Sequence, residues 1–501
     1  MTSNLEALKK HLGKIMDLKA ANNLLSWDQQ VNLPPESGEA RAEQLSTLTS
    51  MAHSLFVSDE TGELLEKAAP EVADLPYESD DAALVRVTRR EYERQRRIPE
   101  ELVAEKARAA ATGFGAWVKA REASDFGQFQ PHLEHILDLT IEYAEALGYE
   151  DQRYDALLDL YEPDMKTARV AEIFGELKEG LVPLVQKIEE RGAAVDDSVL
   201  QKTYPDQDQW DFGLEILRDI GFDFDHGRQD RAAHPFTVGF APEDVRITTR
   251  IYPDQLQSGL FGTIHEGGHA LYEQGIRSEI GRTPLFDGVS YGVHESQSRL
   301  WENVVARSFE FWKHYFPALQ ERFPDQLEGV DLTTFHRAIN KVEPSLIRVE
   351  ADEVTYNLHI FVRFEIEQKL IAEEMEVADL PGVWNEKMNE YLGIVPDDDA
   401  NGVLQDVHWS HGYFGYFPSY ALGNLLSVQF YNQALKDLPN LPQQIENGGF
   451  DDLLHWLREE IHSHGKKFTP TELVERVTGG PMSAEPFLQY VREKYGAIYQ
   501  L

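Results

Sequence analysis

The 501-residue sequence predicts a mainly α-helical protein with a small β-hairpin near its functional site. Apolar residues recur at intervals of three and four along most of the chain, which is the period of one face of an α-helix. Two short segments, 234–240 and 245–251, differ because their residues alternate in polarity or are β-branched, as in strands. The sequence shows no internal repeat, low-complexity tract or convincing linker, so we expect one domain over residues 1–501.

Two amphipathic helices are predicted at the N-terminus, one from position 5 onward and one over residues 41–56. Their inward-facing residues should be Leu5, Leu8, Leu12 and Ile15 in the first helix and Leu45, Leu48, Ala52 and Leu55 in the second. No apolar run of membrane-spanning length and no signal-peptide core follows Met1, so we expect no membrane partner.

The segments 234–240 and 245–251 are joined by residues 241–244, and we interpret them as a β-hairpin placed just before a helix over 256–275. An edge strand at this place can pair with the backbone of an extended peptide.

The helix over 256–275 carries the pattern of a catalytic metal site. His265 and His269 are four residues apart, so both project from one helix face and can reach the same ion. Glu266 then points toward water bound to that ion, which is the arrangement that activates water for hydrolysis. The alternative interpretation is an ordinary helix that carries two histidines by chance. Gly267 and Gly268 each cost about 1 kcal/mol relative to Ala in a helix interior, so we expect a close neighbour at this backbone.

A hydrolytic zinc site normally takes three protein ligands, and Glu295 is the best candidate for the third. It begins a helical stripe at 295, 298, 302, 305, 309, 312 and 316 whose later members are apolar, so Glu295 should be buried. A buried carboxylate needs a partner, which a metal ion supplies. The alternatives are a capping or salt-bridged Glu295 and, as a weaker ligand, His294, which points about 100° away on a helix.

Composition disfavours two classes of partner. The formal charge of −40 disfavours nucleic acid and anionic membranes, because both are themselves polyanions. This charge is explained equally well by a strongly solvated surface and by adaptation to high salt. The sequence has no cysteine, so it can form no disulfide and use no thiol nucleophile, which fits a cytoplasmic protein.

Six motifs in order support a family resemblance. They are HPF at 234–236, DVRIT at 244–248, HEGGH at 265–269, HESQ at 294–297, IRVEAD at 347–352 and GVLQDVHW at 402–409. With these motifs the chain resembles the M32 family of zinc metallocarboxypeptidases over most of its length. The resemblance implies a helical zinc-peptidase fold with a deep central groove, similar to the angiotensin-converting and neurolysin-like peptidases. It also implies a homodimer, and we expect the helices of about residues 1–75 to cover the groove.

Two positions depart from the expected pattern. Asp164 stands where many relatives have glycine after a proline, so we expect a local difference in that turn. Arg299 follows Glu295 by four residues, where thermolysin-like enzymes carry an acid that supports a ligand. The groups that orient the two histidines are therefore left open by the sequence.

The predicted chemistry follows from these residues. Zn²⁺, for which Co²⁺ can substitute, would lower the pKa of its bound water, and Glu266 would accept the proton and pass it to the leaving amine. The oxyanion needs a donor, for which the resemblance suggests His408 and the phenols of Tyr416 and Tyr420. Taken alone, each tyrosine is more typical of a core residue than of a catalytic one.

Four residues are candidates for substrate binding: Arg348, His234, Arg246 and Tyr416. The resemblance assigns Arg348 to the free carboxylate of a peptide, which a guanidinium binds in a paired, planar geometry. From the pattern alone, Arg348 would instead lie on a helix and form an exposed pair with Asp352. His234 fits a substrate contact and a structural histidine equally well, and Arg246 either pairs with Asp244 or closes one end of the groove.

Three functions fit this sequence. The first is a metallocarboxypeptidase of broad specificity that acts on peptides with a free C-terminus. The second is an oligopeptidase that cuts internally with the same zinc chemistry. The third is a catalytically silent peptide-binding protein, which is disfavoured because His265, Glu266, His269 and Glu295 are all present.

Overall fold

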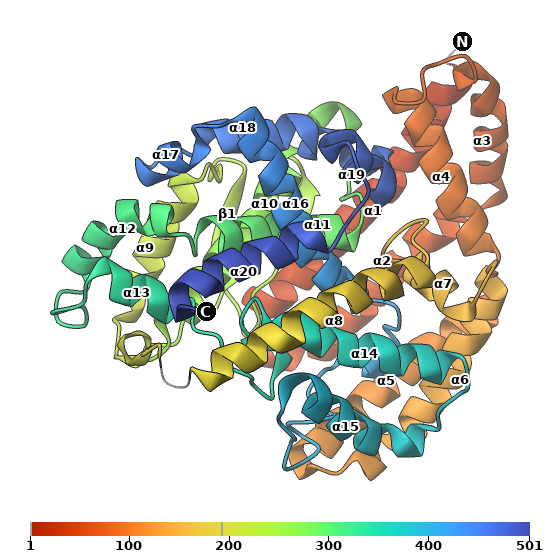
Figure 1. Ribbon diagram of the computed structural model, residues 1–501. Helices are drawn as coiled ribbons and strands as arrows, with labels where there is room; N and C mark the ends of the chain where they lie inside the picture. Colours follow the sequence, from red (N-terminus) through yellow and green to blue (C-terminus); the bar gives the residue numbers. More distant parts are fainter. Residues whose placement is uncertain (1–2, 192–193) are drawn as a thin grey trace.

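The computed structural model describes residues 3–191 and 194–501 and confirms a mainly helical protein (Figure 1). The first part of the chain forms α1 (Asn4–Val31), α2 (Gly38–Phe56), α3 (Asp59–Val72), α4 (Asp80–Arg96), α5 (Glu100–Ala123), α6 (Gln130–Leu147), α7 (Arg153–Leu158), α8 (Thr167–Glu190) and α9 (Asp206–Asp219). The middle part forms β1 (Gly227–Arg231), β2 (Thr237–Ala241), β3 (Asp244–Thr249), α10 (Leu256–Gly275), α11 (Tyr291–Arg299), the π-helix η5 (Leu300–Val305), α12 (Phe309–Arg322) and α13 (Leu332–Ile339). The last part forms α14 (Thr355–Ile371), α15 (Leu380–Leu392), α16 (Pro418–Asp437), α17 (Leu441–Glu446), α18 (Asp451–Glu460), α19 (Pro470–Thr478) and α20 (Glu485–Tyr499).

The predicted hairpin is present as β2 and β3, which pair antiparallel with Thr237 opposite Ile247. A third strand, β1, was not predicted; it pairs parallel with β3, so the order is β1-β3-β2 and β2 lies at an edge. The sheet packs against α10 and β2 against α1. The sheet therefore lies beside the helix that carries the two histidines.

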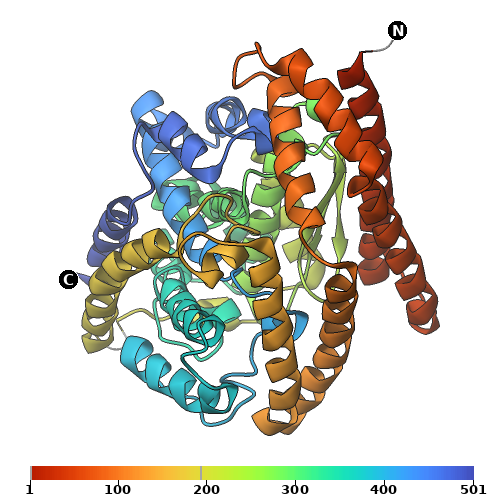
Figure 2. The same ribbon diagram turned by 90° about the vertical axis from the view of Figure 1, so that its right-hand side faces the viewer.

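The apolar core has two parts. The larger one runs from α5 to α20, whereas a smaller one joins α1–α4 to Ile276, Ile280 and Leu285 of the segment after α10. The first two helices form one side of the molecule, next to the sheet (Figure 2). Leu5, Leu8, Leu12 and Ile15 are buried as predicted, whereas in α2 Ala52 is buried and the three leucines are half-buried. No helix in the described ranges is long and apolar enough to span a bilayer.

The predicted stripe from 295 to 316 does not lie on one continuous helix, so this prediction is wrong. Helix α11 ends at Arg299, the π-helix η5 follows, and α12 starts anew at Phe309. A new helix begins after Ser308, because the Ser308 hydroxyl accepts from the backbone N–H of Phe311 at 3.1 Å and so caps the N-terminus of α12. The later apolar residues are still buried because both helices pack on the same core.

The helical pattern predicted around Arg348 is also wrong. Arg348 lies in a short 3₁₀ turn, η6 (Arg348–Glu350), and α14 begins only at Thr355. Asp352 sets that start because its Oδ1 accepts from the backbone N–H groups of Val354 and Thr355 at 2.9 and 3.0 Å. Asp352 is thus a capping residue and not the partner of an exposed Arg348.

The turn at 161–164 has Asp164 at the position where glycine was expected, and the structure shows how the turn accommodates it. Its φ is +66°, which lies in the left-handed region that favours glycine and that aspartate tolerates better than most residues. Its backbone N–H donates to Asp159 Oδ1 at 2.8 Å. The turn is therefore kept without the glycine.

The glycines of the histidine helix have close neighbours, as predicted. A Cβ on Gly268 would lie 2.6 Å from Ser298 Cα and 2.7 Å from Gln297 O, both backbone atoms of α11. A Cβ on Gly267 would meet the Leu217 side chain at 2.5 Å. Gly268 therefore allows the backbones of α10 and α11 to approach each other.

We expect Gly268→Ala to destabilise the metal-free protein by about 2 kcal/mol, because the new methyl group must push two helix backbones apart. Gly262→Ala on the same helix is the matched control, since a Cβ there has no neighbour within 4 Å and should stabilise α10 slightly. Thermal unfolding of both variants measures the difference. Equal midpoints would contradict the assigned role of Gly268.

Candidate active site

A large central cavity of about 2680 Å³ confirms the expected groove. It is lined by α1 and α2 on one side and by β2, α10 and α11 on another. Residues within 338–353 and 405–420 also contribute to its wall. His265, Glu266, His269 and Glu295 all lie in this wall, as does Arg348.

His265, His269 and Glu295 converge as the sequence predicts. Glu295 Oε2 lies 3.3 Å from His269 Nε2 and 3.8 Å from His265 Nε2, and one ligand atom of each residue lies within 4.8 Å of the others. Tetrahedral zinc with bonds of about 2.0–2.1 Å places its ligand atoms roughly 3.3 Å apart. The three residues therefore fit a divalent metal ion with small adjustments.

Each histidine keeps Nε2 for the metal because its Nδ1 is engaged elsewhere. His265 Nδ1 donates to Glu302 Oε2 at 2.8 Å. His269 Nδ1 shares a 2.6 Å hydrogen bond with His294 Nδ1, and His294 Nε2 lies 3.2 Å from Glu273 Oε1. His294, the weaker candidate ligand, thus supports His269. A carboxylate supports each histidine ligand, Glu302 directly for His265 and Glu273 through His294 for His269.

Arg299 explains how two acidic groups, Glu295 and Glu302, are held close together beside the ligands. Its Nε donates to Glu295 Oε1 at 2.7 Å and its Nη1 to Glu302 Oε2 at 3.2 Å. Burial alone would raise the pKa of Glu302, but the charge of Arg299 and the hydrogen bond from His265 outweigh it and lower that pKa to about 2. Both carboxylates are therefore ionised when the site receives a cation.

The protonation of the ligands follows from the same charges. Burial raises the pKa of Glu295 by itself, yet Arg299 and His265 outweigh it and hold the pKa far below its usual range. Burial lowers the pKa of His269 to about 3, so its ring is neutral and ready to bind a metal. Burial also acts to lower the pKa of His265, but Glu295 and Glu302 overcome it and raise that pKa, so a metal has to displace a proton there.

Glu266 is buried beside the ligands and has one strong hydrogen bond. Thr237 of β2 donates its hydroxyl to Glu266 Oε2 at 2.7 Å, so the edge strand positions this carboxylate. Burial raises the pKa of Glu266, which brings a carboxylate closer to the basicity that proton transfer near neutral pH requires.

Arg348 is buried, with 5% of its surface exposed, in a cluster that holds more positive than negative groups. Its Nε and Nη2 donate to Asp406 Oδ1 at 3.0 and 2.7 Å, and its Nη1 donates to Tyr356 at 2.7 Å. Arg363, fully buried, donates to the other oxygen of Asp406 at 2.7 Å. One carboxylate thus faces two guanidinium groups, and burial keeps His408 neutral by lowering its pKa to about 3.

The three aromatic candidates gather beside this cluster. His408 Nε2 lies 3.3 Å from the Tyr420 hydroxyl, and the rings of Tyr416 and Tyr420 meet edge to face with centroids 5.2 Å apart. Burial raises the pKa of Tyr420 well above 10, so its hydroxyl keeps a proton to donate. Glu367 holds the loop that carries His408, because it accepts from Trp409 Nε1 at 2.7 Å and from Gly415 N at 2.9 Å.

His234 and Arg246 have different surroundings. Among the described residues, the cavity wall includes His234 but not Arg246. Arg246 donates to both oxygens of Asp244 at 2.8 and 2.9 Å and lies 4.5 Å from the centre of the Trp27 ring of α1. Of the two roles predicted for Arg246, the structure shows the ion pair with Asp244. Its contact with Trp27 also links the hairpin to α1.

Comparison with known proteins agrees with this geometry. Residues 7–495 match the model of the carboxypeptidase Taq (M32) metallopeptidase family. The chain belongs to this family. It is a metallocarboxypeptidase, and the resemblance inferred from the six motifs is confirmed.

Relatives of this M32 enzyme match over nearly their whole length. The chain is 47% identical over 493 residues to thermostable carboxypeptidase 1 of Thermus thermophilus, covering 96% of each protein. It is 40% identical over 490 residues to carboxypeptidase 1 of Bacillus subtilis, covering 98% of this chain and 97% of the relative. The crystal structure of an M32 carboxypeptidase from Deinococcus radiodurans R1 aligns with a TM-score of 0.96 and 41% identity, covering 99% of this chain and 100% of that one.

Several site residues of the M32 enzyme were missed by the sequence reasoning. Glu302, whose side chain is 12% exposed, lies on the stripe predicted to be buried, and a carboxylate on such a stripe was a usable signal. Asp406 lies inside a quoted motif, but nothing in its spacing indicates a partnership with Arg348. Tyr356 gave no local signal, although its ring lies 4.6 Å from the Arg299 guanidinium and its hydroxyl binds Arg348.

Glu162, also missed, joins the two helices that meet at the M32 site. It is fully buried, and its Oε1 accepts from the backbone N–H of Gly292 in α11 and from the Ser419 hydroxyl in α16, both at 2.6 Å. Burial raises its pKa from the usual 4.5 to about 7. The folded protein therefore holds this proton more tightly than the unfolded chain.

This shift predicts a pH-dependent loss of stability. Between pH 4.5 and 7 the folded state binds more protons at Glu162 than the unfolded state, so stability falls as the pH rises through that window, by about 2–3 kcal/mol. Glu162→Gln keeps the shape but cannot titrate, so the wild type should lose stability relative to this variant from pH 4.5 to 7. Unfolding midpoints that run parallel over this range would contradict the assignment.

Proposed function

We propose that this M32 enzyme removes single residues of broad side-chain type from the C-terminus of peptides that end in a free carboxylate. The observation that carries the proposal is the excess positive charge of the cluster formed by Arg348, Arg363 and Asp406. Arg348 and Asp406 lie in the wall of the cavity that holds the metal ligands. A buried charge without a partner is costly, and a substrate carboxylate would complete the cluster.

The hydrogen bonds of Arg348 leave room for that carboxylate. A guanidinium has five N–H donors, of which two are used by Asp406 and one by Tyr356, so two remain. Their fixed planar geometry suits the two oxygens of a terminal carboxylate. Arg348 would therefore place the last peptide bond relative to the metal ligands.

We propose Zn²⁺ as the native ion, with Co²⁺ able to replace it, held by His265, His269 and Glu295. Two imidazoles and one carboxylate suit zinc, and the supporting carboxylates Glu302 and Glu273 fit such a site. A bound ion of this type supplies Lewis acidity, which makes water acidic near neutral pH and polarises the scissile carbonyl.

Glu266 would take the proton from the attacking water and deliver it to the departing amine. Its burial and the hydrogen bond from Thr237 support this role, because the first raises basicity and the second fixes the oxygen. Tyr420 and neutral His408 would donate hydrogen bonds to the negative oxygen of the tetrahedral species, and Tyr416 would pack on the substrate.

The outer parts of the cavity would hold the rest of the peptide. The edge strand β2 and His234 lie in the wall, where β2 can pair with an extended backbone. We further propose that residues 1–501 act as one peptidase domain in which the helices of about residues 1–75 cover the cavity. This is supported by the wall residues that α1 and α2 contribute. A homodimer in the cytoplasm is proposed from the family and from the absence of cysteine.

Glu266→Gln should separate metal binding from chemistry. The change preserves shape but removes the base, so the metal content should persist while turnover falls by about 100-fold or more. Metal analysis and single-turnover assays on the same preparation measure both effects. Near-normal turnover in a preparation free of wild-type enzyme would exclude Glu266 as the base.

Paired peptides with free and amidated C-termini test the role of Arg348 on the intact enzyme. The amidated peptide leaves the guanidinium unpaired, so its kcat/KM should be lower by at least about 100-fold. Arg348→Ala should lose most activity on the free peptide and retain its metal. Arg250→Ala is the control, because Arg250 lines the same cavity but is exposed. Equal cleavage of both peptides by the wild type would overturn carboxylate recognition and favour internal cleavage.

A further inference from the structure

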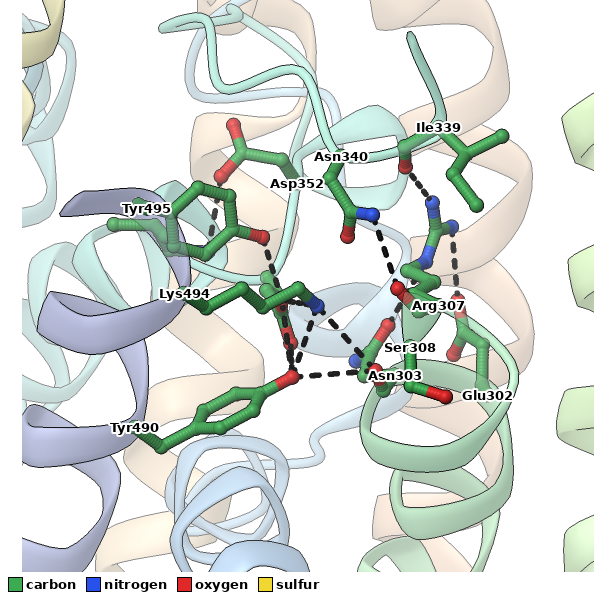
Figure 3. A network of polar contacts seen from close by, with 12 residues as sticks. Glu302, Asn303, Arg307, Ser308, Ile339, Asn340, Asp352, Tyr490, Lys494 and Tyr495 are labelled. Carbon is green, nitrogen blue, oxygen red and sulfur yellow. Dashed lines mark hydrogen bonds and ion pairs between the residues drawn. The ribbon is translucent and has the colours of Figure 1, made fainter. Parts of the chain in front are cut away.

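The π-helix η5 carries the carboxylate that supports His265 and is itself held from behind by the C-terminal helix α20 (Figure 3). Its wide turn is closed by a hydrogen bond from Ala306 N to Trp301 O, five residues apart. The Glu302 side chain and the backbone carbonyl of Asn303, the next residue in this turn, face different neighbours. The turn is therefore contacted on two sides, by the metal site and by α20.

On the metal side, Glu302 has three donors. His265 Nδ1 and Arg299 Nη1 donate to Oε2 at 2.8 and 3.2 Å, and Arg307 Nη2 reaches Oε1 at 3.5 Å. Arg307 also donates to Asn303 Oδ1 at 3.2 Å and to Ile339 O at 2.5 Å. The direction of the His265 ring therefore depends on where this turn lies.

On the opposite side, the backbone carbonyl of Asn303 accepts from α20. The Tyr490 hydroxyl donates to it at 3.2 Å and Lys494 Nζ at 3.5 Å. This carbonyl is at the C-terminal end of a helix, where carbonyls lack intrahelical donors and where a lysine is favourable. Helix α20 thus caps η5.

Buried charges fix the position of α20 in turn. Glu353 pairs with Lys494 and accepts from the Tyr495 hydroxyl at 2.5 Å. It also shares the single proton of the Tyr490 hydroxyl with Asn303 O, since each acceptor oxygen lies 3.2 Å from that hydroxyl. The Glu353 side chain is 2% exposed and that of Lys494 is 11% exposed. The pair is shielded from salt, so it can hold the Tyr490 hydroxyl and the ammonium group in one place.

We propose that Tyr490 and Lys494, held by Glu353, are positioning residues for the metal centre: they fix η5 so that Glu302 keeps the His265 ring aimed at the ion. The inference rests on the His–His–Glu metal site and not on the choice of substrate. If this proposal is wrong, the zinc affinity of the variants will show it. If the proposed recognition of the substrate carboxylate is wrong, cleavage of amidated peptides will show that instead.

Zinc affinity of the full-length protein, measured by competition with a chromogenic chelator, tests the proposal without an activity assay. Tyr490→Phe removes one hydroxyl and leaves the Lys494–Glu353 pair in place. Loss of a group that supports a metal ligand typically weakens binding by about 10–100-fold, so we expect roughly 10-fold weaker zinc binding for this more distant contact. Glu302→Gln should weaken zinc binding by about 10–100-fold.

A double-mutant cycle distinguishes positioning from general destabilisation. If Tyr490 acts through Glu302, adding Tyr490→Phe to Glu302→Gln should change zinc affinity by less than about twofold. A second variant, Glu353→Leu with Lys494→Met, removes both charges together so that neither is left unpaired. It too should weaken zinc binding only when Glu302 is present. If that variant does not fold, Tyr490→Phe decides the question.

Tyr391→Phe is the matched control. Tyr391 also belongs to a lysine–glutamate–tyrosine cluster, in which it donates to Glu365 at 2.7 Å, but that cluster joins α14 and α15. Its loss should leave zinc affinity within about twofold of the wild type. Wild-type zinc affinity in Tyr490→Phe, or an equal loss with and without Glu302, would overturn the proposal.

Discussion

The metal site depends on the close approach of three helix backbones. Helix α11 lies between Gly268 of α10 and Gly423 of α16, and a Cβ on either glycine would come within 2.6 Å of α11 atoms. At Gly423 those atoms are the Cβ and Cγ of Glu295 itself. Packing at this density fixes the position of the third ligand, because dense interiors transmit small shifts directly. Glycine at both sites lowers the intrinsic helix propensity, but only glycine allows the helices to approach this closely.

Around the ligands, charged groups are buried in a continuous array. Glu295 binds Arg299, whose guanidinium lies 4.6 Å from the centre of the Tyr356 ring, and Tyr356 accepts from Arg348. Such groups contribute little net stability, because desolvation offsets most of their attraction. They fix geometry, since each one is placed correctly only when its neighbours are present. The array thus connects the support of a metal ligand with the guanidinium proposed to bind the substrate.

Elements with a strong local signal were predicted correctly, and those set by distant contacts were not. The hairpin and α10 follow from local periodicity and turn residues. Strand β1 was missed because its parallel partner is reached through an intervening strand, a relation that no local pattern encodes. The stripe from 295 to 316 has a helical period throughout, yet it is divided by the π-helix and by the cap at Ser308.

By itself the sequence determined the His–His–Glu metal site, because the spacing of four in a helix places His265 and His269 on one face whatever surrounds them. The burial of Glu295 was also readable, since it depends on the apolar residues of the same stripe. Only the tertiary structure decided what orients these ligands and where Arg348 points. Glu302, Asp406 and Glu353 act on groups up to 142 residues away along the chain, as Glu353 does on Tyr495. Such contacts arise from the packing of complete helices, so no local pattern of residues specifies them.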